Sequence, residues 1–254
     1  MSKSHGKYVW YELATSDVEG AKKFYGDVIG WGTDRFGGPE GDYTIWKAGA
    51  QGIGGAMTLP EEARKAGAPP RWVGYVYVDD VDAIVAKAKS LGGHEVVPPT
   101  DLPDVGRIAM VSDPQGAVIA MIKPNGPEAP WLDEVPDGHV SWNELLAGEQ
   151  EAALHFYAEL FGWQKEQAVP MPNGIYQLYG KHGHTLGGMM TRPTGYPAPP
   201  HWLYYVKVAD LDAAIERVRK SGGKVMMGPM EVPGGSRIAQ CTDPQGAAFA
   251  LNGR

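Results

Sequence analysis

Two glutamates carry the side chains best suited to chemistry in this sequence. Glu12 stands in the run Trp10-Tyr-Glu-Leu, and Glu144 stands in the matching run Trp142-Asn-Glu-Leu. Because side chains two residues apart on a strand share a face, each carboxylate is expected beside an indole. In a poorly hydrated cavity such a carboxyl group could act as a general base or hydrogen-bond a ligand amine or hydroxyl. We therefore predict Glu12 and Glu144 as the catalytic residues of any activity, with Trp10 and Trp142 beside them in ligand binding.

Two arginines offer another explanation of the same acids. Arg107 occurs in the run Gly-Arg-Ile-Ala, and Arg237 occurs in the echo Ser-Arg-Ile-Ala. A salt bridge from Glu12 to Arg107, repeated from Glu144 to Arg237, would explain the pairing of both features equally well. A buried ion pair of that kind helps to fix the register of the strands more than it stabilises the fold. Arg107 and Arg237 are also candidates for ligand binding.

The chain contains an internal duplication with a nearly constant offset. The matched segments are Val9–Trp31 with Ser141–Trp163, Gly52–Met57 with Thr185–Met190, Pro69–Ala83 with Pro199–Ala213, and Asp113-Pro-Gln-Gly with Asp243-Pro-Gln-Gly. Between the copies lies a stretch rich in proline, glycine and acidic residues, which is typical of a linker. We predict an N-terminal domain over residues 1–123, a linker over 124–137 and a C-terminal domain over 138–254.

Each copy is predicted to contain a strand, a helix and about three strands, twice over. In the first copy, apolar residues fall on one stripe of helices predicted over Asp17–Ile29 and Asp80–Leu91. The predicted short strands are Tyr43–Ala48, Gly52–Leu59, Glu95–Val97, Arg107–Ser112 and Ala117–Ile122. Asp-Pro-Gln-Gly predicts a tight turn, because proline presets φ and glycine accepts positive φ. The fold class is therefore α+β.

This order and these motifs resemble the vicinal oxygen chelate superfamily, which contains glyoxalase I, bleomycin-resistance proteins and extradiol dioxygenases. The resemblance rests on W-Y-E-L with A-x-x-F-Y-x-x-x-x-G-W, the Gly-Gly strand, D-D-V-D-A and G-R-I-A followed by D-P-Q-G-A. It implies two tandem modules, each with two βαβββ units that form a curved, cup-shaped mixed sheet with helices on the outer face. The superfamily hosts several chemistries, so the resemblance specifies the fold better than the reaction.

Metal-dependent members of that superfamily hold a divalent ion with His, Gln or Glu side chains from the first and last strand of each unit. Such an ion polarises two neighbouring substrate oxygens or activates dioxygen. The residues at the corresponding places are Trp10, Gly54, Gly55, Ala56, Val73 and Ala120 in one copy, and Trp142, Gly187, Gly188, Met189, Leu203 and Ala250 in the other. The resemblance therefore predicts no metal in the cups and no cofactor.

Histidines offer a different metal site. His182 and His184 alternate around a glycine, and His201 and Glu144 belong to the same copy. The first copy has no matching histidines. Solvent-facing side chains near a hairpin are the interpretation that we favour.

Tyrosines are the other candidates for binding a ligand. Tyr75, Tyr77 and Tyr205 share the parity of the cup face, where aromatic walls could stack against a planar or extended organic molecule. They could equally be core. Tyr43 and Tyr176 lie on a middle strand, and the spacing leaves their role undecided.

Composition limits the partners. The 254-residue chain has a formal charge of −7 and no basic block, which argues against binding to nucleic acid or anionic lipid. The single cysteine, Cys241, excludes an intrachain disulfide and is expected to be a buried small residue. No apolar stretch approaches a membrane span or a signal core, so we expect a cytoplasmic protein, either a monomer or a homodimer.

The sequence thus predicts a glyoxalase-like protein that binds a small apolar or aromatic organic molecule in one or both cups. Binding is expected to be independent of metal, with proton-transfer chemistry assisted by the glutamates. A metal-dependent lyase resembling lactoylglutathione lyase, or an extradiol-type dioxygenase, is one alternative. A sequestering or partner-binding protein without turnover is the other.

Overall fold

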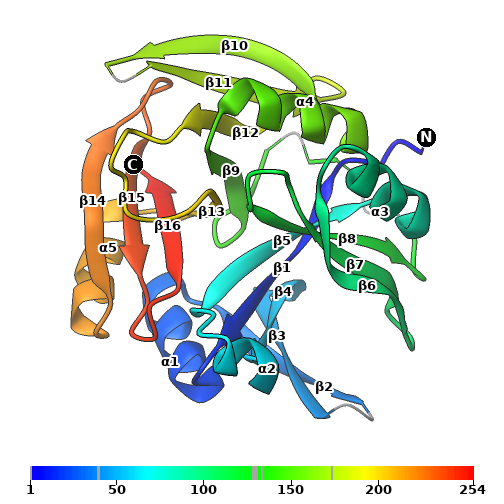
Figure 1. The fold of residues 1–254 in the computed structure, drawn as a ribbon. Coiled ribbons are helices and arrows are strands. Elements are labelled where there is room, and N and C mark those ends of the chain that lie inside the picture. The colour runs from blue at the N-terminus through cyan, green and yellow to red at the C-terminus, as the bar shows by residue number, and fades with distance from the viewer. Residues whose placement is uncertain (1, 39–40, 128–130, 133, 173) are drawn as a thin grey trace. The chain divides into compact units, whose positions relative to one another are not determined.

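The computed structural model describes residues 2–38, 41–127, 131–132, 134–172 and 174–254, and both repeats carry the same order of strands (Figure 1). The strands of the first repeat are β1 (Tyr8–Thr15), β2 (Gly32–Gly38), β3 (Gly41–Ala48), β4 (Gln51–Thr58), β5 (Arg71–Tyr77), β6 (His94–Leu102), β7 (Gly106–Ser112) and β8 (Val118–Pro124). Those of the second are β9 (Val140–Ala147), β10 (Gln164–Met171), β11 (Gly174–Lys181), β12 (His184–Thr191), β13 (His201–Lys207), β14 (Lys224–Glu231), β15 (Arg237–Thr242) and β16 (Ala248–Gly253).

Each repeat forms one curved, mixed sheet of eight strands. The strand order is β2-β3-β4-β1-β5-β8-β7-β6 in the first sheet and β10-β11-β12-β9-β13-β16-β15-β14 in the second. Strand β1 pairs with β4, and β5 with β8, in parallel, as do their counterparts in the second repeat. Consecutive strands within the hairpins are antiparallel. The predicted α+β class with two tandem modules is confirmed.

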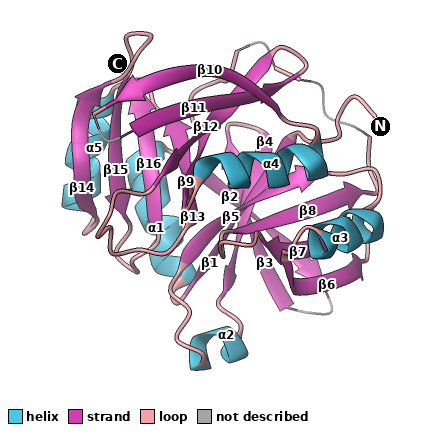
Figure 2. Ribbon diagram, turned by 45° about the horizontal axis from the view of Figure 1, so that its top comes forward, coloured by secondary structure: helices cyan, strands magenta, loops and turns pink. Residues whose placement is uncertain are grey.

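Helices cover one face of the strands that they contact. They are α1 (Val18–Ile29), α2 (Glu61–Lys65), α3 (Val81–Ser90), α4 (Gln150–Phe161) and α5 (Leu211–Lys220). Helix α3 lies against β6, β7 and β8, and α5 lies against β14, β15 and β16 (Figure 2). Helix α4 contacts β12, and α1 contacts β4. The opposite face of each strand is therefore the one available to a ligand.

Helix α1 shows why the sequence folds locally as predicted. The Asp17 carboxylate accepts a hydrogen bond from the backbone N–H of Gly20 at 2.9 Å, so Asp17 is the N-cap and the helix begins one residue later. Gly30 ends the helix with φ of 89°, a left-handed conformation that glycine adopts without a steric penalty. The buried residues of α1 are Ala21, Phe24, Tyr25 and Val28. Asp80 caps α3 in the same way.

Edge strands were the part of the fold that spacing predicted least well. Strand β2 has no regular alternation of apolar residues and pairs with β3 through its backbone. Strand β6 is longer than the predicted Glu95–Val97 and continues through Pro98 and Pro99, which an edge strand tolerates because one side of its backbone is unpaired. The connection between β4 and β5 contains the short helix α2.

The chain divides into two compact units that combine halves of both repeats. One unit contains Met1–Val9, Gly74–Asp133 and Trp142–Trp202, and the other contains Trp10–Val73, Glu134–Ser141 and Leu203–Arg254. Within the first unit α3 contacts α4, and within the second α1 contacts α5. Each unit thus has helices from both copies in its core.

A buried hydrogen-bond chain joins the two halves of each unit. The Tyr157 hydroxyl on α4 donates to Asp113 Oδ2 at 3.0 Å and accepts from Trp202 Nε1 at 3.2 Å. Asp113 Oδ1 accepts from the backbone N–H of Gln115 and Ala117, which organises the Asp-Pro-Gln-Gly turn. In the other unit the corresponding chain is Trp72, Tyr25 and Asp243. These repeated motifs therefore have a structural role, because a turn of one repeat is bonded to a helix of the other.

None of the helices in the described part of the chain combines the length and the apolar character needed to cross a bilayer.

Candidate functional site

Glu12 is one of three side chains that hydrogen bonds join into a chain. The Tyr43 hydroxyl on β3 donates to Glu12 Oε2 at 2.9 Å and accepts from Trp10 Nε1 at 3.0 Å. Trp10 and Glu12 both come from β1, and they share a face as the alternation of a strand requires. All three are partly buried. The phenol therefore fixes the carboxylate and the indole relative to each other.

The second repeat builds the same arrangement. The Tyr176 hydroxyl on β11 donates to Glu144 Oε2 at 2.8 Å and accepts from Trp142 Nε1 at 2.8 Å. Glu144 is 7% exposed, whereas Glu12 is only partly buried. The two sites thus share their donors and acceptors and differ in how far the acid is removed from solvent.

The Gly-Gly pair of β4 makes room for this chain of hydrogen bonds. Gly55 lies opposite Glu12 in the parallel pairing of β1 and β4. A Cβ atom at Gly55 would overlap the Tyr43 hydroxyl and ring, and one at Gly54 would overlap the carbonyl oxygen of Tyr11. The second repeat repeats both constraints, at Gly188 against the Tyr176 ring and at Gly187 against a β9 carbonyl. The Gly-Gly motif therefore lets the tyrosine ring lie over β4 and lets β1 approach it closely.

Burial keeps the central phenol protonated. Desolvation, followed by the charge of Glu12, raises the pKa of Tyr43 well above its usual value. The Tyr43 O–H therefore remains a donor at any physiological pH, and the carboxylate oxygen that receives it is held in one orientation. A fixed carboxylate next to an indole can accept a proton from a bound molecule or bind a donor group on it.

The three other predicted tyrosines are buried. Tyr205 on β13 accepts a hydrogen bond at 2.8 Å from Gln240 Nε2 on β15. Lys123 Nζ donates to the Tyr77 hydroxyl and lies 4.8 Å from the centroid of the same ring. Tyr75 is 4% exposed. Their part in ligand binding stays a prediction.

The arginines pair with other acids than the two glutamates. Arg107 bonds to Asp82 at 2.5 Å and to Asp101 at 2.9 Å, and Arg237 bonds to Asp212 at 2.8 Å. Asp82 and Asp212 lie in the first turns of α3 and α5, so both guanidinium groups point to the helix-bearing face of their strands. The alternative of a salt bridge from Glu12 to Arg107, and its counterpart in the second repeat, is therefore wrong. Each arginine is instead held by aspartates of its own compact unit.

The residues at the family's metal-ligand places do not fit a divalent ion. Trp10 and Trp142 use their indole N–H groups as donors to tyrosine, and Ala120 and Ala250 are buried without a polar side chain. Within the described ranges, His, Cys, Asp and Glu side chains form no group of three or more that could hold a metal ion. At these places each repeat offers a metal ion one carboxylate, which is hydrogen-bonded to a phenol.

Of the three histidines considered as an alternative metal site, two contact an indole and the third contacts a tyrosine. The His184 ring stacks on Trp131 with centroids 4.9 Å apart, and His182, which has φ of 54° in the turn before β12, contacts the same indole edge-on. His201 stacks on Tyr196, and its Nδ1 lies 2.8 Å from the carbonyl oxygen of Pro199.

Tyr43 and Tyr176, whose roles the spacing leaves undecided, are the residues that bond to the two glutamates. A signal was present, because each is one strand away from a glycine pair that is itself opposite the glutamate. Recognising it requires the register of three strands, which the sequence pattern alone does not supply.

Comparison with protein families and curated relatives extends over nearly the whole chain. The model of the Glyoxalase/Bleomycin resistance protein/Dioxygenase superfamily matches residues 7–121 and, a second time, residues 138–251. The "Putative glyoxylase CFP32" of Mycobacterium tuberculosis is 34% identical over 245 residues, which cover 95% of this chain and 92% of the relative. The "Anthracycline biosynthesis protein DnrV" of Streptomyces peucetius is 27% identical and covers 97% of this chain and 92% of its own length.

Solved structures share the fold at low sequence identity. The Mn(II)-bound glyoxalase from Novosphingobium aromaticivorans superposes with a TM-score of 0.66 and 15% identity, covering 98% of this chain and 82% of that one. The dioxygenase LapB from Pseudomonas sp. KL28 superposes with a TM-score of 0.68 and 13% identity, covering 100% and 94%.

Proposed function

Since the chain belongs to the Glyoxalase/Bleomycin resistance protein/Dioxygenase superfamily, we propose that it binds a small apolar or aromatic organic molecule next to Glu12, Glu144 or both. The glutamate carboxylate then transfers a proton of the bound molecule. The carboxylate takes a proton from carbon next to a carbonyl group and returns it, so that it is unchanged after each cycle. No metal takes part in this proposal.

The observation that carries the proposal is the duplicated bond from phenol to glutamate. In each repeat the same residue types meet at nearly the same distances, 2.9 Å for Tyr43 with Glu12 and 2.8 Å for Tyr176 with Glu144. A carboxylate that serves only as a surface charge needs no buried hydrogen-bond donor, and it needs no glycine pair to make room for that donor. Fixed orientation is the property that general-base catalysis uses.

The class of ligand follows from the neighbours of the acid. Trp10 and Trp142 place an indole on the same face as each glutamate, and an aromatic face favours a flat, apolar molecule. Two relatives are named for anthracycline biosynthesis, and anthracyclines are fused-ring aromatic ketones. We therefore propose a fused-ring aromatic ketone as the substrate class.

Exchange of carbon-bound hydrogen tests the reaction. β-Tetralone, a fused-ring ketone with acidic hydrogens next to its carbonyl, is incubated with the protein in heavy water, and deuterium incorporation is followed by proton NMR. We expect exchange above the buffer rate, reduced about a hundredfold or more in a Glu12→Gln, Glu144→Gln double variant, because general-base catalysis contributes roughly that much. The single variants assign the activity to one repeat or to both.

Binding is measured separately with quinizarin, a fused-ring aromatic that absorbs visible light. Exchange that survives the double substitution would exclude the glutamates as bases. Quinizarin binding without exchange would instead support a sequestering protein. Glutathione-dependent isomerisation of methylglyoxal, appearing only after addition of Ni²⁺, Zn²⁺, Fe²⁺ or Mn²⁺, would favour the metal-dependent alternative.

A further inference from the structure

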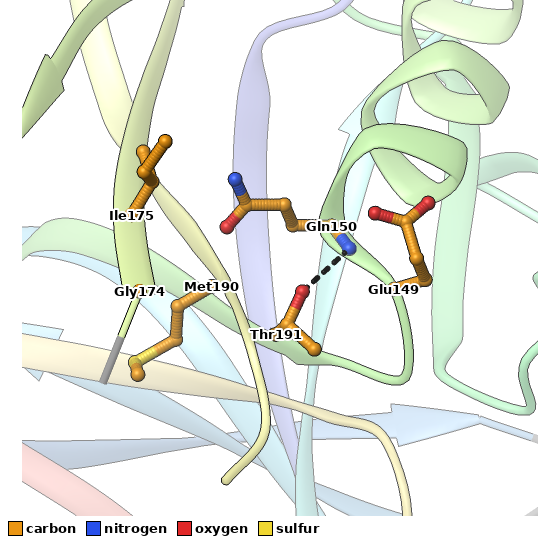
Figure 3. A pocket seen from close by; sticks show the side chains of 6 residues that line it. All are labelled: Glu149, Gln150, Gly174, Ile175, Met190 and Thr191. Carbon is orange, nitrogen blue, oxygen red and sulfur yellow. Dashed lines mark hydrogen bonds between the residues drawn. The ribbon is translucent and has the colours of Figure 1, made fainter.

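A pocket lies at the N-terminal end of α4, within the compact unit that contains Glu144. It has a volume of ≈ 260 Å³ and opens to solvent (Figure 3). Its lining residues are Glu149, Gln150, Gly174, Ile175, Met190 and Thr191. It sits at the ends of β9 and β12, where Thr191 pairs with Ala147 in parallel register. An engineered cavity of about 150 Å³ holds benzene, so this pocket has room for a substituted benzene ring.

Gln150 is the polar residue that the fold leaves unsatisfied there. It is 7% exposed, and its Oε1 atom is buried without a hydrogen-bond partner. Figure 3 shows its side chain extending away from Glu149, toward Ile175 and Met190. Its backbone N–H is already used, since it donates to Thr191 Oγ1 at 3.1 Å. A buried acceptor without a partner costs about 1–3 kcal/mol, which a ligand that supplies a donor would recover.

The neighbours of Gln150 restrict the ligand further. Ile175 is 49% exposed and Met190 is partly exposed, so they offer apolar surface. Both carboxylate oxygens of Glu149 accept backbone N–H groups of α4, at 3.0 Å and 2.7 Å from Glu151 and Ala152. Glu149 therefore caps the helix and leaves a negative charge at the mouth of the pocket, which disfavours an anion.

The first repeat provides a natural comparison. Its residue at the position of Gln150 is Val18, the first residue of α1, which follows the N-cap Asp17 as Gln150 follows Glu149. A valine is thus compatible with this place in the fold. The amide is a feature of the second repeat that helix formation does not require.

We propose that this pocket binds a neutral organic molecule with an apolar ring and a carboxamide or a similar adjacent donor and acceptor. A carboxamide pairs with the Gln150 amide through two hydrogen bonds, one in each direction, while its ring contacts Ile175 and Met190. Met190 pairs with Tyr176, the hydrogen-bond partner of Glu144, so the pocket adjoins that site. The proposal rests on Gln150 and does not depend on the reaction proposed at Glu144.

Benzamide tests the proposal in the full-length protein. Chemical shifts of labelled isoleucine and methionine methyl groups are followed during titration with benzamide and with acetophenone, which has the same ring and carbonyl but no N–H. We expect saturable shifts at Ile175 and Met190 with benzamide, and binding at least about tenfold weaker for acetophenone, since one hydrogen bond to a buried group accounts for that ratio.

Gln150→Val is the matched variant. It is expected to weaken benzamide binding about tenfold more than it weakens acetophenone binding, because benzamide loses two hydrogen bonds and acetophenone loses one. The variant should keep the free energy of unfolding at or above that of the wild type, because it removes a buried unpaired oxygen. Equal affinities for benzamide and acetophenone in the wild type would overturn the proposal, and that comparison needs no variant. So would shifts that never saturate, or benzamide binding unaffected in a folded Gln150→Val protein.

Discussion

The Tyr43 hydroxyl lies 2.9 Å from Glu12 Oε2 and donates its proton to it, and Tyr176 repeats this bond to Glu144. Each tyrosine also accepts an indole N–H, so removing one hydroxyl breaks two hydrogen bonds, one to the glutamate and one from the tryptophan. The acid, the phenol and the indole therefore act as a unit in both repeats.

Tyr43→Phe is expected to lower the free energy of unfolding by about 1–2 kcal/mol, because two partly buried hydrogen bonds are lost while the ring stays in place. Urea denaturation followed by circular dichroism measures the change. Tyr196→Phe, whose ring stacks on His201 outside this group, is the control and should have little effect. An unchanged midpoint for Tyr43→Phe would mean that the bond contributes nothing to the fold.

Gly55→Ala is expected to destabilise the protein by roughly 1–3 kcal/mol, as overpacking does, because the new methyl group overlaps the Tyr43 ring. Gly37→Ala is the matched control, since a Cβ atom at Gly37 on β2 meets no atom within 4 Å. Thermal unfolding of the two variants compares a crowded strand glycine with an open one. Equal losses in the two variants would show that overlap with the Tyr43 ring does not explain the glycine.

Asp113→Asn is expected to change how stability depends on pH. Burial raises the pKa of Asp113 above its ordinary value of 3.8, so the folded state binds the proton more tightly than the unfolded state. The stabilising effect of that proton is full below pH 3.8 and is lost as pH rises through the folded pKa. The advantage of the wild type over Asp113→Asn should therefore be larger near pH 3.5 than at pH 7, in urea titrations at both. An advantage that grows with pH would contradict this sign.

Cys241 is expected to be unreactive in the native protein. Burial raises the pKa of its thiol to about 12, and the side chain is 1% exposed. Since the thiolate is the nucleophile, labelling by Ellman's reagent at pH 8 should be slow and should become rapid in concentrated urea. Rapid labelling without urea would show that β15 opens readily.

The duplication, the order of strands and helices and the family were available from the sequence. Local rules determine them: Asp17 caps a helix, Gly30 ends it, and its apolar stripe recurs in the copy. The two glutamates could be singled out as well, because they share a motif.

Tertiary structure alone decided what those residues touch. Arg107 is bonded to Asp82 instead of Glu12, because its strand β7 lies against α3, the helix that carries Asp82. Tyr157 of one repeat is bonded to Asp113 of the other, a contact between residues 44 positions apart in the chain. Such pairings depend on strand register and on packing between distant segments, and neither is encoded in the spacing of residues along one segment.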